Sequence, residues 1–398
     1  MEEAFRASVH SHTIPGVVLL ASSRDGKFQY SNSFGNLSIA DANSAPISAD
    51  SSMWIASCTK LLTTIAALQC VERGLLGLNA DVSPILPELR DPDILTGFDA
   101  RGQPTYVKAQ NQITLRQLLT HSSGLAYDMF NPTIQQWRAS QGQPIAPGTT
   151  IRERYLGPLL YEPGTGWEYS PAIDFVGLMV ERVSGAGNLQ AYMEREIWSP
   201  LRITEMTFFP QGRDDLKARM PAMSLRDKAS GKAVPRPRVV QEPPTDAMGG
   251  GGIYATPAEY MKVLHAVLKN DGTLLKRETV EDMFRPQLSG QSRAALLKVM
   301  SFPDVNGMTG GLPEGTKRDW GFGGLLIMQD LEGWRSKGTM TWGGMPNLTW
   351  WIDRKVGICG LYASQILPPG DPKSVEMSAL FEKTMYERYR RERERERL

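Results

Sequence analysis

The chain has segments of strand character at both ends and a long middle of helical character. After a short helix expected over residues 2–12, the sequence VVLLASSRDGKFQYSNSFG is typical of two strands joined by a turn. Near the other end, short β-rich segments lie within WGFGGLLIMQ, GTMTWGG, NLTWWID and GICGLYASQ, and a helical segment follows them. We therefore predict an α/β (α+β) fold, in which an antiparallel sheet built from both chain ends is flanked by helices.

The middle of the chain carries apolar residues at helical spacing. The five clearest segments are ITLRQLLTHSS, IDFVGLMVERVSG, NLQAYMEREIW, TPAEYMKVLHAVLKNDG and KRETVEDMF. With 398 residues, and ~100–200 residues for an ordinary domain, the chain has room for two units. We predict a sheet domain of residues 1–90 plus 305–398 and an inserted, mainly helical domain of residues 91–304, with the active site between them.

Two local patterns stand next to each other in the helical part. Thr256, Pro257 and Glu259 match a capping box with proline at the first helical position, which predicts a helix from Tyr260 onward. The preceding Gly249–Gly252 lacks the spacing of a phosphate-binding loop, so close backbone packing is the better interpretation of these glycines.

The charge balance restricts the partners of the chain. Lys and Arg number 44 and Asp and Glu 43, a formal net charge of +1, so bulk electrostatics favour neither nucleic acid nor an anionic membrane. The N-terminus shows no signal-peptide pattern and the longest apolar stretch is too short for a bilayer, so we expect a cytoplasmic protein. The three cysteines, Cys58, Cys70 and Cys359, lack CxxC spacing, which predicts free thiols.

The histidines give no support to metal or triad chemistry. None of His10, His12, His121 and His265 stands in an HExxH pattern or beside a ligand cluster, so we expect neither a metal nor a cofactor. No GxSxG pentapeptide occurs, so a nucleophile elbow is not indicated. We expect His121, at a helix end, and His265, in a helix interior, to be hydrogen-bonded structural residues.

The segment WIASCTKLLTTIAALQCVERGLLGL carries the residues with the clearest chemistry. An extended start gives way at Ser57 to a long helix with apolar periodicity, which closes at Gly74. Ser57 and Lys60 stand at i and i+3, so the ammonium can lie beside the hydroxyl on one face of the first turn. Free N–H groups and the positive end of the helix dipole favour negative charge at the same place. The tetrapeptide alone also fits a serine N-cap followed by an unrelated lysine.

An ordered set of motifs resembles the serine β-lactamase and penicillin-binding protein superfamily, in its class C β-lactamase and family VIII carboxylesterase branch. The resemblance covers nearly the whole chain, through IPGVVLLA, SCTKLLTTIAALQ, ITLRQLLTHSSGL, PGTGWEYSPAIDFVGLMVERVSG, GGGIYATPAEYMKVL and TWGGMPN. The chain looks closest to the fungal esterases and acyltransferases that act on statin-type polyketide side chains. The resemblance implies a β-lactamase/transpeptidase-like fold.

The first two motifs of that family imply the catalytic residues. Its SxxK motif matches Ser57 and Lys60, and its YxN or YSN motif matches Tyr169, with Pro171 in place of the asparagine. The resemblance therefore implies Ser57 as the nucleophile and Lys60 with Tyr169 as one coupled base. An ammonium ~4 Å from the phenol oxygen would favour the phenolate by about 4 kcal/mol at an effective dielectric of ~20.

The third motif, KTG or HTG in β-lactamases, falls on Trp342, Gly343 and Gly344. An indole in place of the ammonium suits a neutral apolar substrate, although Trp342 is equally well explained as a core residue. The resemblance further implies backbone oxyanion donors at Ser57 and Met345, and substrate contacts from Tyr127, Trp342 and Gly344. Tyr127 is equally consistent with simple packing.

The sequence thus predicts a serine carboxylesterase that hydrolyses an apolar ester, such as the acyl side chain of a statin-like polyketide, through an acyl-enzyme on Ser57. An acyltransferase that passes the acyl group to an alcohol would use the same residues, but the WGG variant and the lack of a basic surface for an acyl carrier favour the esterase. A binding protein on an inactive hydrolase scaffold is disfavoured, because all three reactive residues are present. The expected partner is a small-molecule ester, without nucleic acid, membrane or an obligatory protein partner.

Overall fold

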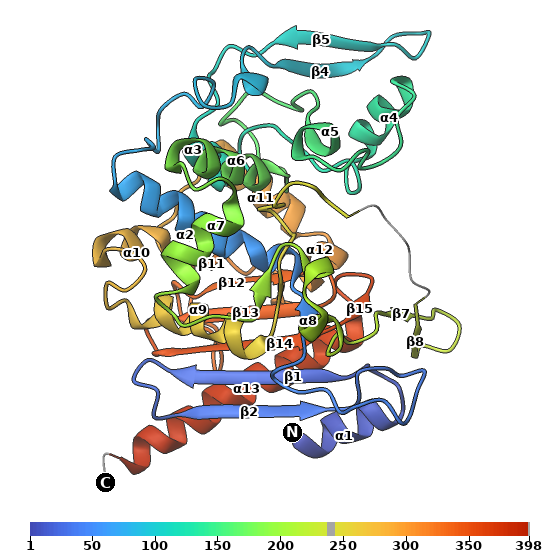
Figure 1. The fold of residues 1–398 in the computed structure, drawn as a ribbon, viewed down its shortest axis with the longest axis vertical. Coiled ribbons are helices and arrows are strands. Elements are labelled where there is room, and N and C mark those ends of the chain that lie inside the picture. The colour runs from blue at the N-terminus through green and yellow to red at the C-terminus, as the bar shows by residue number, and fades with distance from the viewer. Residues whose placement is uncertain (237–242, 397–398) are drawn as a thin grey trace.

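Both ends of the chain enter one seven-stranded antiparallel sheet, with the strand order β10-β11-β12-β13-β14-β1-β2 (Figure 1). The computed structural model describes residues 1–236 and 243–396, so parts of the predicted ranges 91–304 and 305–398 lie outside the described residues. β1 pairs with β14 along its whole length, from Val17 opposite Ser364 to Ser23 opposite Ile358. The strands are β1 (Val17–Ser23), β2 (Gln29–Phe34), β10 (Arg318–Trp320), β11 (Leu325–Ile327), β12 (Met340–Gly344), β13 (Leu348–Asp353) and β14 (Ile358–Ser364). The predicted N-terminal hairpin and the predicted sheet from both ends are confirmed.

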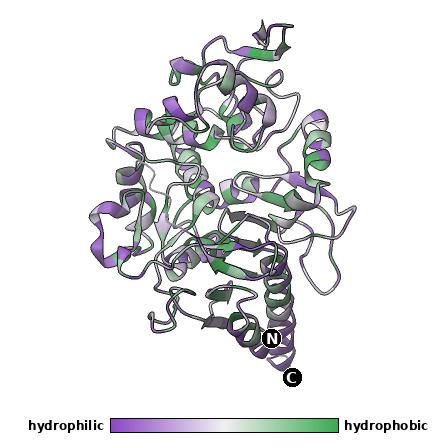
Figure 2. Cartoon of the chain, turned by 90° about the vertical axis from the view of Figure 1, so that its right-hand side faces the viewer, coloured by the Kyte–Doolittle hydropathy of each residue, from purple (hydrophilic) through white to green (hydrophobic). Residues whose placement is uncertain are grey.

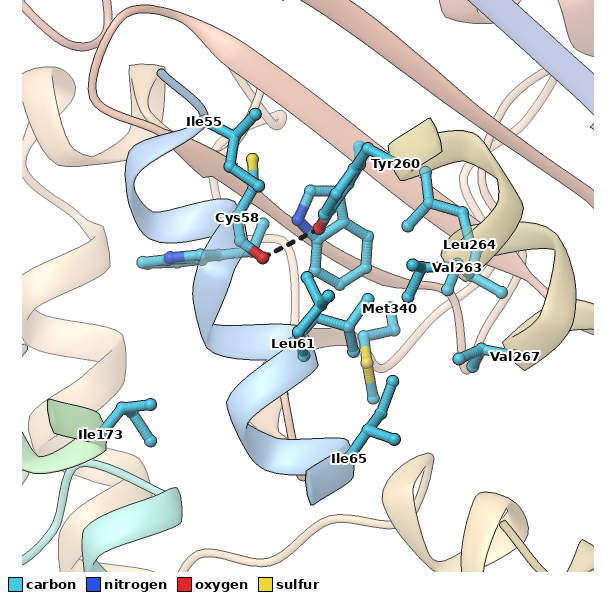
Figure 3. Packing of buried hydrophobic residues seen from close by; sticks show 14 of the residues in the cluster. Ile55, Cys58, Leu61, Ile65, Ile173, Tyr260, Val263, Leu264, Val267 and Met340 are labelled. Carbon is cyan, nitrogen blue, oxygen red and sulfur yellow. Dashed lines mark hydrogen bonds between the residues drawn. The ribbon is translucent and has the colours of Figure 1, made fainter. Parts of the chain in front are cut away.

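Helices cover both faces of this sheet, because alternate residues of a strand point to opposite sides. Trp351 of β13 packs on Phe381 and Tyr362 of β14 on Phe5, with ring centroids 5.5 and 6.5 Å apart. Met340 of β12 points to the other face (Figure 3). Figure 2 shows apolar colour along the strands at the centre of the molecule. The covering helices are α1 (Glu2–His10) and α13 (Pro372–Arg395) on the first face, and α2 (Thr59–Glu72) and α9 (Pro257–Lys269) on the second.

The middle of the chain folds mainly into helices, as predicted. Its further helices are α3 (Leu115–Leu119), α4 (Pro132–Ser140), α5 (Ile151–Tyr155), α6 (Ala172–Ser184), α7 (Leu189–Met193), α8 (Asp214–Lys217), α10 (Arg277–Met283), α11 (Gly290–Met300) and α12 (Pro303–Gly307). Each of the five predicted helical segments contains one helix, although α7 changes to a π-helical turn, η3, at Glu194–Trp198.

Small sheets also occur apart from the large one, and the sequence analysis did not predict them. A hairpin of β4 and β5 extends from the helical part at the top of Figure 1. The turn between its arms contains Gly102, which has φ +74° in the left-handed region. The additional strands are β3 (Met53–Trp54), β4 (Asp93–Phe98), β5 (Pro104–Lys108), β6 (Met206–Thr207), β7 (Ser224–Arg226), β8 (Ala233–Pro235), β9 (Tyr254–Ala255) and β15 (Ile366–Leu367).

The start of α9 follows the predicted pattern at its N-cap. Thr256 Oγ1 accepts a hydrogen bond from the Glu259 amide at 3.3 Å, and Pro257 occupies the first turn. The Glu259 carboxylate turns to Lys262, with Oε2 2.7 Å from Nζ, in place of the reciprocal bond of a capping box. A predicted helix is therefore confirmed, with half of its predicted cap.

The three cysteines are buried free thiols, as predicted. Within the described ranges, no helix is both long enough and apolar enough to cross a membrane.

Candidate active site

Ser57 lies on a tight 3₁₀ turn, η1 (Ala56–Cys58), that leads directly into α2. Ala56 has φ +44°, in the left-handed region, which costs a residue with a side chain about 1–2 kcal/mol. Within residues 55–60 every side chain is buried except that of Ser57, which is half-buried. The turn therefore presents one hydroxyl from an otherwise enclosed backbone.

Contacts from three distant segments hold this turn. The Ile55 amide donates to the Ile253 carbonyl at 3.0 Å, and the buried Tyr260 hydroxyl of α9 donates to the Cys58 carbonyl at 3.0 Å (Figure 3). At the end of β12, a Cβ added to Gly344 would lie 2.3 Å from the Ile55 carbonyl oxygen. Only glycine allows the strand to approach the turn this closely.

Met345 follows Gly344 in the turn between β12 and β13, and its side chain is half-buried. The preceding Gly344 approaches the turn on both sides of Ser57, at the Ile55 carbonyl and the Cys58 sulfur. The role of the Ser57 and Met345 amides as oxyanion donors stays a prediction.

Lys60 is buried at 2% exposure, and its ammonium has three hydrogen-bond partners. Nζ donates to Ser57 Oγ at 3.4 Å, to the Tyr127 hydroxyl at 3.1 Å and to the Gly250 carbonyl at 2.7 Å. Nζ also lies 4.7 Å from the centroid of the Tyr169 ring, within the range of a cation–π contact. The three N–H donors of the ammonium are therefore all used, one of them on the serine.

Tyr169 meets Lys60 through its ring face, and its hydroxyl accepts a hydrogen bond from Trp342 Nε1 at 3.2 Å. The coupled base of Lys60 and Tyr169 stays a prediction: the two residues are in contact through the tyrosine ring, while the ammonium donates its hydrogen bond to the Tyr127 hydroxyl. Trp342 is 6% exposed, and its ring centroid lies 5.1 Å from that of Tyr169. The indole is thus packed against the tyrosine and bonded to it.

Tyr127 links Lys60 to a buried acid that the sequence analysis missed. Its hydroxyl donates to Asp174 Oδ2 at 3.4 Å, and Asp174 Oδ1 accepts from the Gly250 amide at 2.9 Å. Burial, together with the Asp174 carboxylate, raises the pKa of Tyr127 well above its usual value. Burial also raises the pKa of Asp174, against the opposing influence of Lys60. A signal was present, because Asp174 stands among the apolar residues of α6.

The glycine run forms a backbone strap beside α2, which confirms close packing as its explanation. The Gly249 carbonyl accepts from Thr63 Oγ1 at 2.7 Å, and the Gly251 carbonyl accepts from Trp54 Nε1 at 2.7 Å. A Cβ added to Gly250 would lie 2.2 Å from Asp174 Oδ2, a distance that forces movement. The strap therefore needs glycine where α2 and α6 meet.

The two histidines with predicted structural roles are hydrogen-bonded, as expected. His121 Nδ1 accepts from the Ser170 amide at 3.3 Å, and Nε2 of His265 lies 3.2 Å from the Ser23 carbonyl oxygen. Burial and the charge of Lys60 lower the pKa of His121 well below its usual value. The neutral His121 ring thus accepts the hydrogen bond that fixes Ser170, the residue after Tyr169.

The described residues contain no group of three or more His, Cys, Asp or Glu side chains that could hold a metal ion. The polar groups gathered around Ser57 are an ammonium, phenols and backbone amides. Such a set can activate a hydroxyl, accept its proton and stabilise an oxyanion, which are the requirements of covalent acyl transfer.

An antiparallel sheet with an SxxK serine at the start of a buried helix is the arrangement of the β-lactamase family. The family model described as Beta-lactamase matches residues 1–381, and the chain belongs to this family. The predicted fold and the predicted enzyme class, a serine hydrolase, are thereby confirmed.

Within this family, the chain is similar to enzymes whose names refer to statins and their precursors. The chain is 38% identical to a lovastatin esterase of Penicillium rubens over 98% of each protein. It is 38% identical to a monacolin J acid methylbutanoyltransferase of Aspergillus terreus, over 98% of this chain and 95% of the relative. A solved structure of a simvastatin synthase mutant from Aspergillus terreus superposes with a TM-score of 0.91 at 38% identity, over 98% of this chain and 94% of that one.

Proposed function

We propose that the chain is a serine carboxylesterase that hydrolyses an apolar ester through an acyl-enzyme on Ser57. The observation that carries the proposal is the 3.4 Å contact between Lys60 Nζ and Ser57 Oγ, at the one half-buried side chain of an enclosed turn. A serine hydroxyl is a weak nucleophile unless a neighbouring base takes its proton. Lys60 stands where such a base, or its electrostatic partner, is needed.

The reaction consists of two acyl transfers. In the first, Ser57 Oγ bonds to the ester carbonyl carbon while the hydroxyl proton passes to the base formed by Lys60 and Tyr169. Collapse of the tetrahedral intermediate breaks the bond to the alcohol oxygen, which receives that proton. In the second, water attacks the acyl carbon, gives its proton to the same base, and the proton returns to Ser57 as the acid leaves.

Tyr169 is the proposed proton carrier of this base. The Trp342 N–H donates to its hydroxyl oxygen, and the Lys60 ammonium lies over its ring, so both contacts bring positive charge next to the phenol. The amides of Ser57 and Met345 are the proposed donors to the oxyanion.

The proposed substrate is a neutral, apolar ester, as on the acyl side chain of a statin-like polyketide. Beside Tyr169 lies Phe130, which is 42% exposed, with ring centroids 6.4 Å apart, and its neighbour Met129 is 43% exposed. These side chains support apolar substrate contact near the hydroxyl. Tyr127, Trp342 and Gly344 remain proposed substrate contacts, and Trp342 also donates a hydrogen bond to Tyr169. The name of the relative from Penicillium rubens, a lovastatin esterase, supports the same substrate class.

Acyl transfer to a polyketide alcohol is the second candidate. It is favoured by one observation, the 38% identity to a methylbutanoyltransferase, which equals the identity to the esterase. Both reactions share the acyl-enzyme and differ in whether water or an alcohol receives the acyl group.

The division into two parts, the cellular location and the lack of an obligatory protein partner are further proposals. We propose that the sheet part, residues 1–90 plus 305–398, and the helical part, residues 91–304, meet at the site. Ser57, Lys60 and Trp342 come from the first range, and Tyr127 and Tyr169 from the second. A cytoplasmic location and the lack of an obligatory protein partner are likewise predictions; the three free thiols support the first.

Mass spectrometry of products tests the function. An apolar acyl ester is incubated with the enzyme, with and without a polyketide alcohol at saturating concentration, and peptide mapping after a fluorophosphonate locates the adduct. We expect the adduct on Ser57, and free acid forming faster than the transferred ester. Faster accumulation of the transferred ester would favour the acyltransferase, and labelling away from Ser57 would defeat both candidates.

A further inference from the structure

We propose that Asp174 is a positioning residue that orients Lys60 toward Ser57 through two intermediaries, the Tyr127 hydroxyl and the Gly250 peptides. The inference rests on the proposed function, in which Lys60 serves Ser57. Asp174 is 1% exposed and lies in the first turn of α6, on a different segment from all four residues that it would influence.

The two intermediaries converge on one atom. Tyr127 donates to Asp174 Oδ2, so its oxygen is left as an acceptor for Lys60 Nζ at 3.1 Å. Gly250 gives its amide to Asp174 Oδ1 and takes Lys60 Nζ on its carbonyl at 2.7 Å. Asp174 therefore fixes the two oxygen atoms, of Tyr127 and Gly250, that accept two of the three ammonium N–H groups. The third N–H is then directed at Ser57 Oγ.

The hydroxyl contacts of this network are long. The distances from Tyr127 to Asp174 Oδ2 and from Lys60 Nζ to Ser57 Oγ are each 3.4 Å. Catalytic hydrogen bonds are often long in an enzyme without substrate and shorten in the reacting complex. Because the Asp174 carboxylate is fixed, Tyr127 and Lys60 are expected to keep their orientation as both contacts shorten.

The neighbours of Asp174 within the described residues are those of the Lys60 network and of α5. The charged or titratable groups that face it are Lys60 from α2, Tyr127, and Arg154 and Tyr155 at α5. Its two side-chain oxygens bond only to Gly250 and Tyr127 among the described residues. The close approach also explains Gly250, because an added Cβ there would lie 2.9 Å from the Tyr127 oxygen as well.

Asp174→Asn tests this role with little change in shape. The amide oxygen can still accept from Gly250, but the amide nitrogen now faces Tyr127 as a donor, so the hydroxyl can no longer donate there. We expect kcat to fall roughly 13- to 160-fold, the loss that corresponds to a hydrogen bond to a charged group, with KM unchanged within about twofold. Removal of a negative charge near the base also lowers its pKa, so the acid limb of kcat/KM should move to lower pH.

Asp353→Asn is the matched control. Asp353 is also fully buried, and its oxygens accept from the Ser336 amide, the Ser336 hydroxyl and Tyr386 on the other face of the sheet. This variant should lower the melting temperature without moving the acid limb. Wild-type kcat and acid limb in Asp174→Asn would overturn the inference, and so would an equal loss of kcat in the two variants.

Tyr127→Phe decides the case if Asp174→Asn does not fold, because it removes only the intermediary hydroxyl. A fall in kcat of about tenfold or more supports the inference, and unchanged kcat overturns it; a rise in KM alone reports only the proposed contact of Tyr127 with substrate. Ser57→Ala and Lys60→Ala are measured in parallel. Undiminished turnover in either of these would defeat the proposed function itself, whereas strongly impaired Ser57→Ala and Lys60→Ala beside normal Asp174→Asn and Tyr127→Phe would defeat this inference alone.

Discussion

Two buried cations lie on opposite faces of the sheet and have opposite kinds of partner. Arg335, fully buried, binds Glu382 of α13 through two parallel hydrogen bonds of 2.7 Å. Lys60, on the α2 side, bonds to two hydroxyls and a carbonyl, and the nearest carboxylate of its network, Asp174, is one hydroxyl away. Arginine stays charged in proteins and suits a structural ion pair, whereas lysine is the cation that enzymes use as a general base.

We therefore expect Arg335 to stabilise the fold and Lys60 to take part in catalysis. The Arg335 pair ties the segment before β12 to α13. The Lys60 network reaches Ser57 directly and is assembled from α2, α6 and the glycine strap. Variants of the two cations should therefore differ in what they change, catalysis in one case and stability in the other.

The largest effect is expected at Lys60. Lys60→Ala should lower turnover by ~10²–10⁴, the usual contribution of general acid–base groups. Lys60→Arg should not restore it, because arginine keeps its proton in proteins. Initial rates on an apolar aryl ester, with melting temperatures for each variant, measure this. An Lys60→Arg enzyme as active as the wild type would mean that the two buried cations are chemically equivalent, and would break the contrast.

The next effect is on stability. Glu382→Gln leaves Arg335 buried without its counter-charge, and we expect the free energy of unfolding to fall by about 3–5 kcal/mol. The kcat of the folded enzyme should not change. Urea titration and active-site-titrated rates give the two quantities. Glu376→Gln, in an exposed pair with Lys373, is the control and should cost less than about 1 kcal/mol.

A smaller effect is expected from the indole behind Tyr169. Trp342→Phe removes one neutral hydrogen bond of about 0.5–1.5 kcal/mol, so kcat should fall roughly 2- to 13-fold. Steady-state kinetics on neutral esters separate kcat from KM. A rise in KM with kcat unchanged would make the indole a substrate contact and remove it from the Lys60 network.

The smallest effect is expected at Cys58, the thiol next to Ser57. The side chain is fully buried, and burial raises the pKa of the thiol, so it is a poor nucleophile. Cys58→Ala should keep activity within about twofold of the wild type, and iodoacetamide should not inactivate the enzyme. Inactivation by iodoacetamide that Cys58→Ala abolishes would contradict the assignment of Ser57.

The sequence predicted those features that depend on residues close together in the chain. The contact of Lys60 with Ser57 spans three residues, and the cap of α9 also spans three, so local spacing was sufficient for both. The partners of Lys60 at Tyr127 and Gly250 are 67 and 190 residues away. No local pattern selects Tyr127 over Tyr169 for that bond, because the choice depends on how α2 and α6 pack.

Asp174 and the hairpin β4–β5 escaped prediction for different reasons. Asp174 stands in an apolar helix face, a detectable conflict, but its purpose depends on the folded glycine strap. The hairpin is a two-stranded element at the periphery, and its short arms produce a weak periodic signal inside a region dominated by helices.

The pairing of β1 with β14 also has a consequence for synthesis on the ribosome. Val17 is made early, but its partner Ser364 follows only after about 350 further residues, which at ~5–20 residues per second takes roughly 17–70 s. During that interval the apolar edge of β1 is exposed and can pair with another nascent chain. Heterologous production should therefore benefit from slow translation at low temperature and from holding chaperones, and chains that stop before β14 should aggregate even where their helical part has folded.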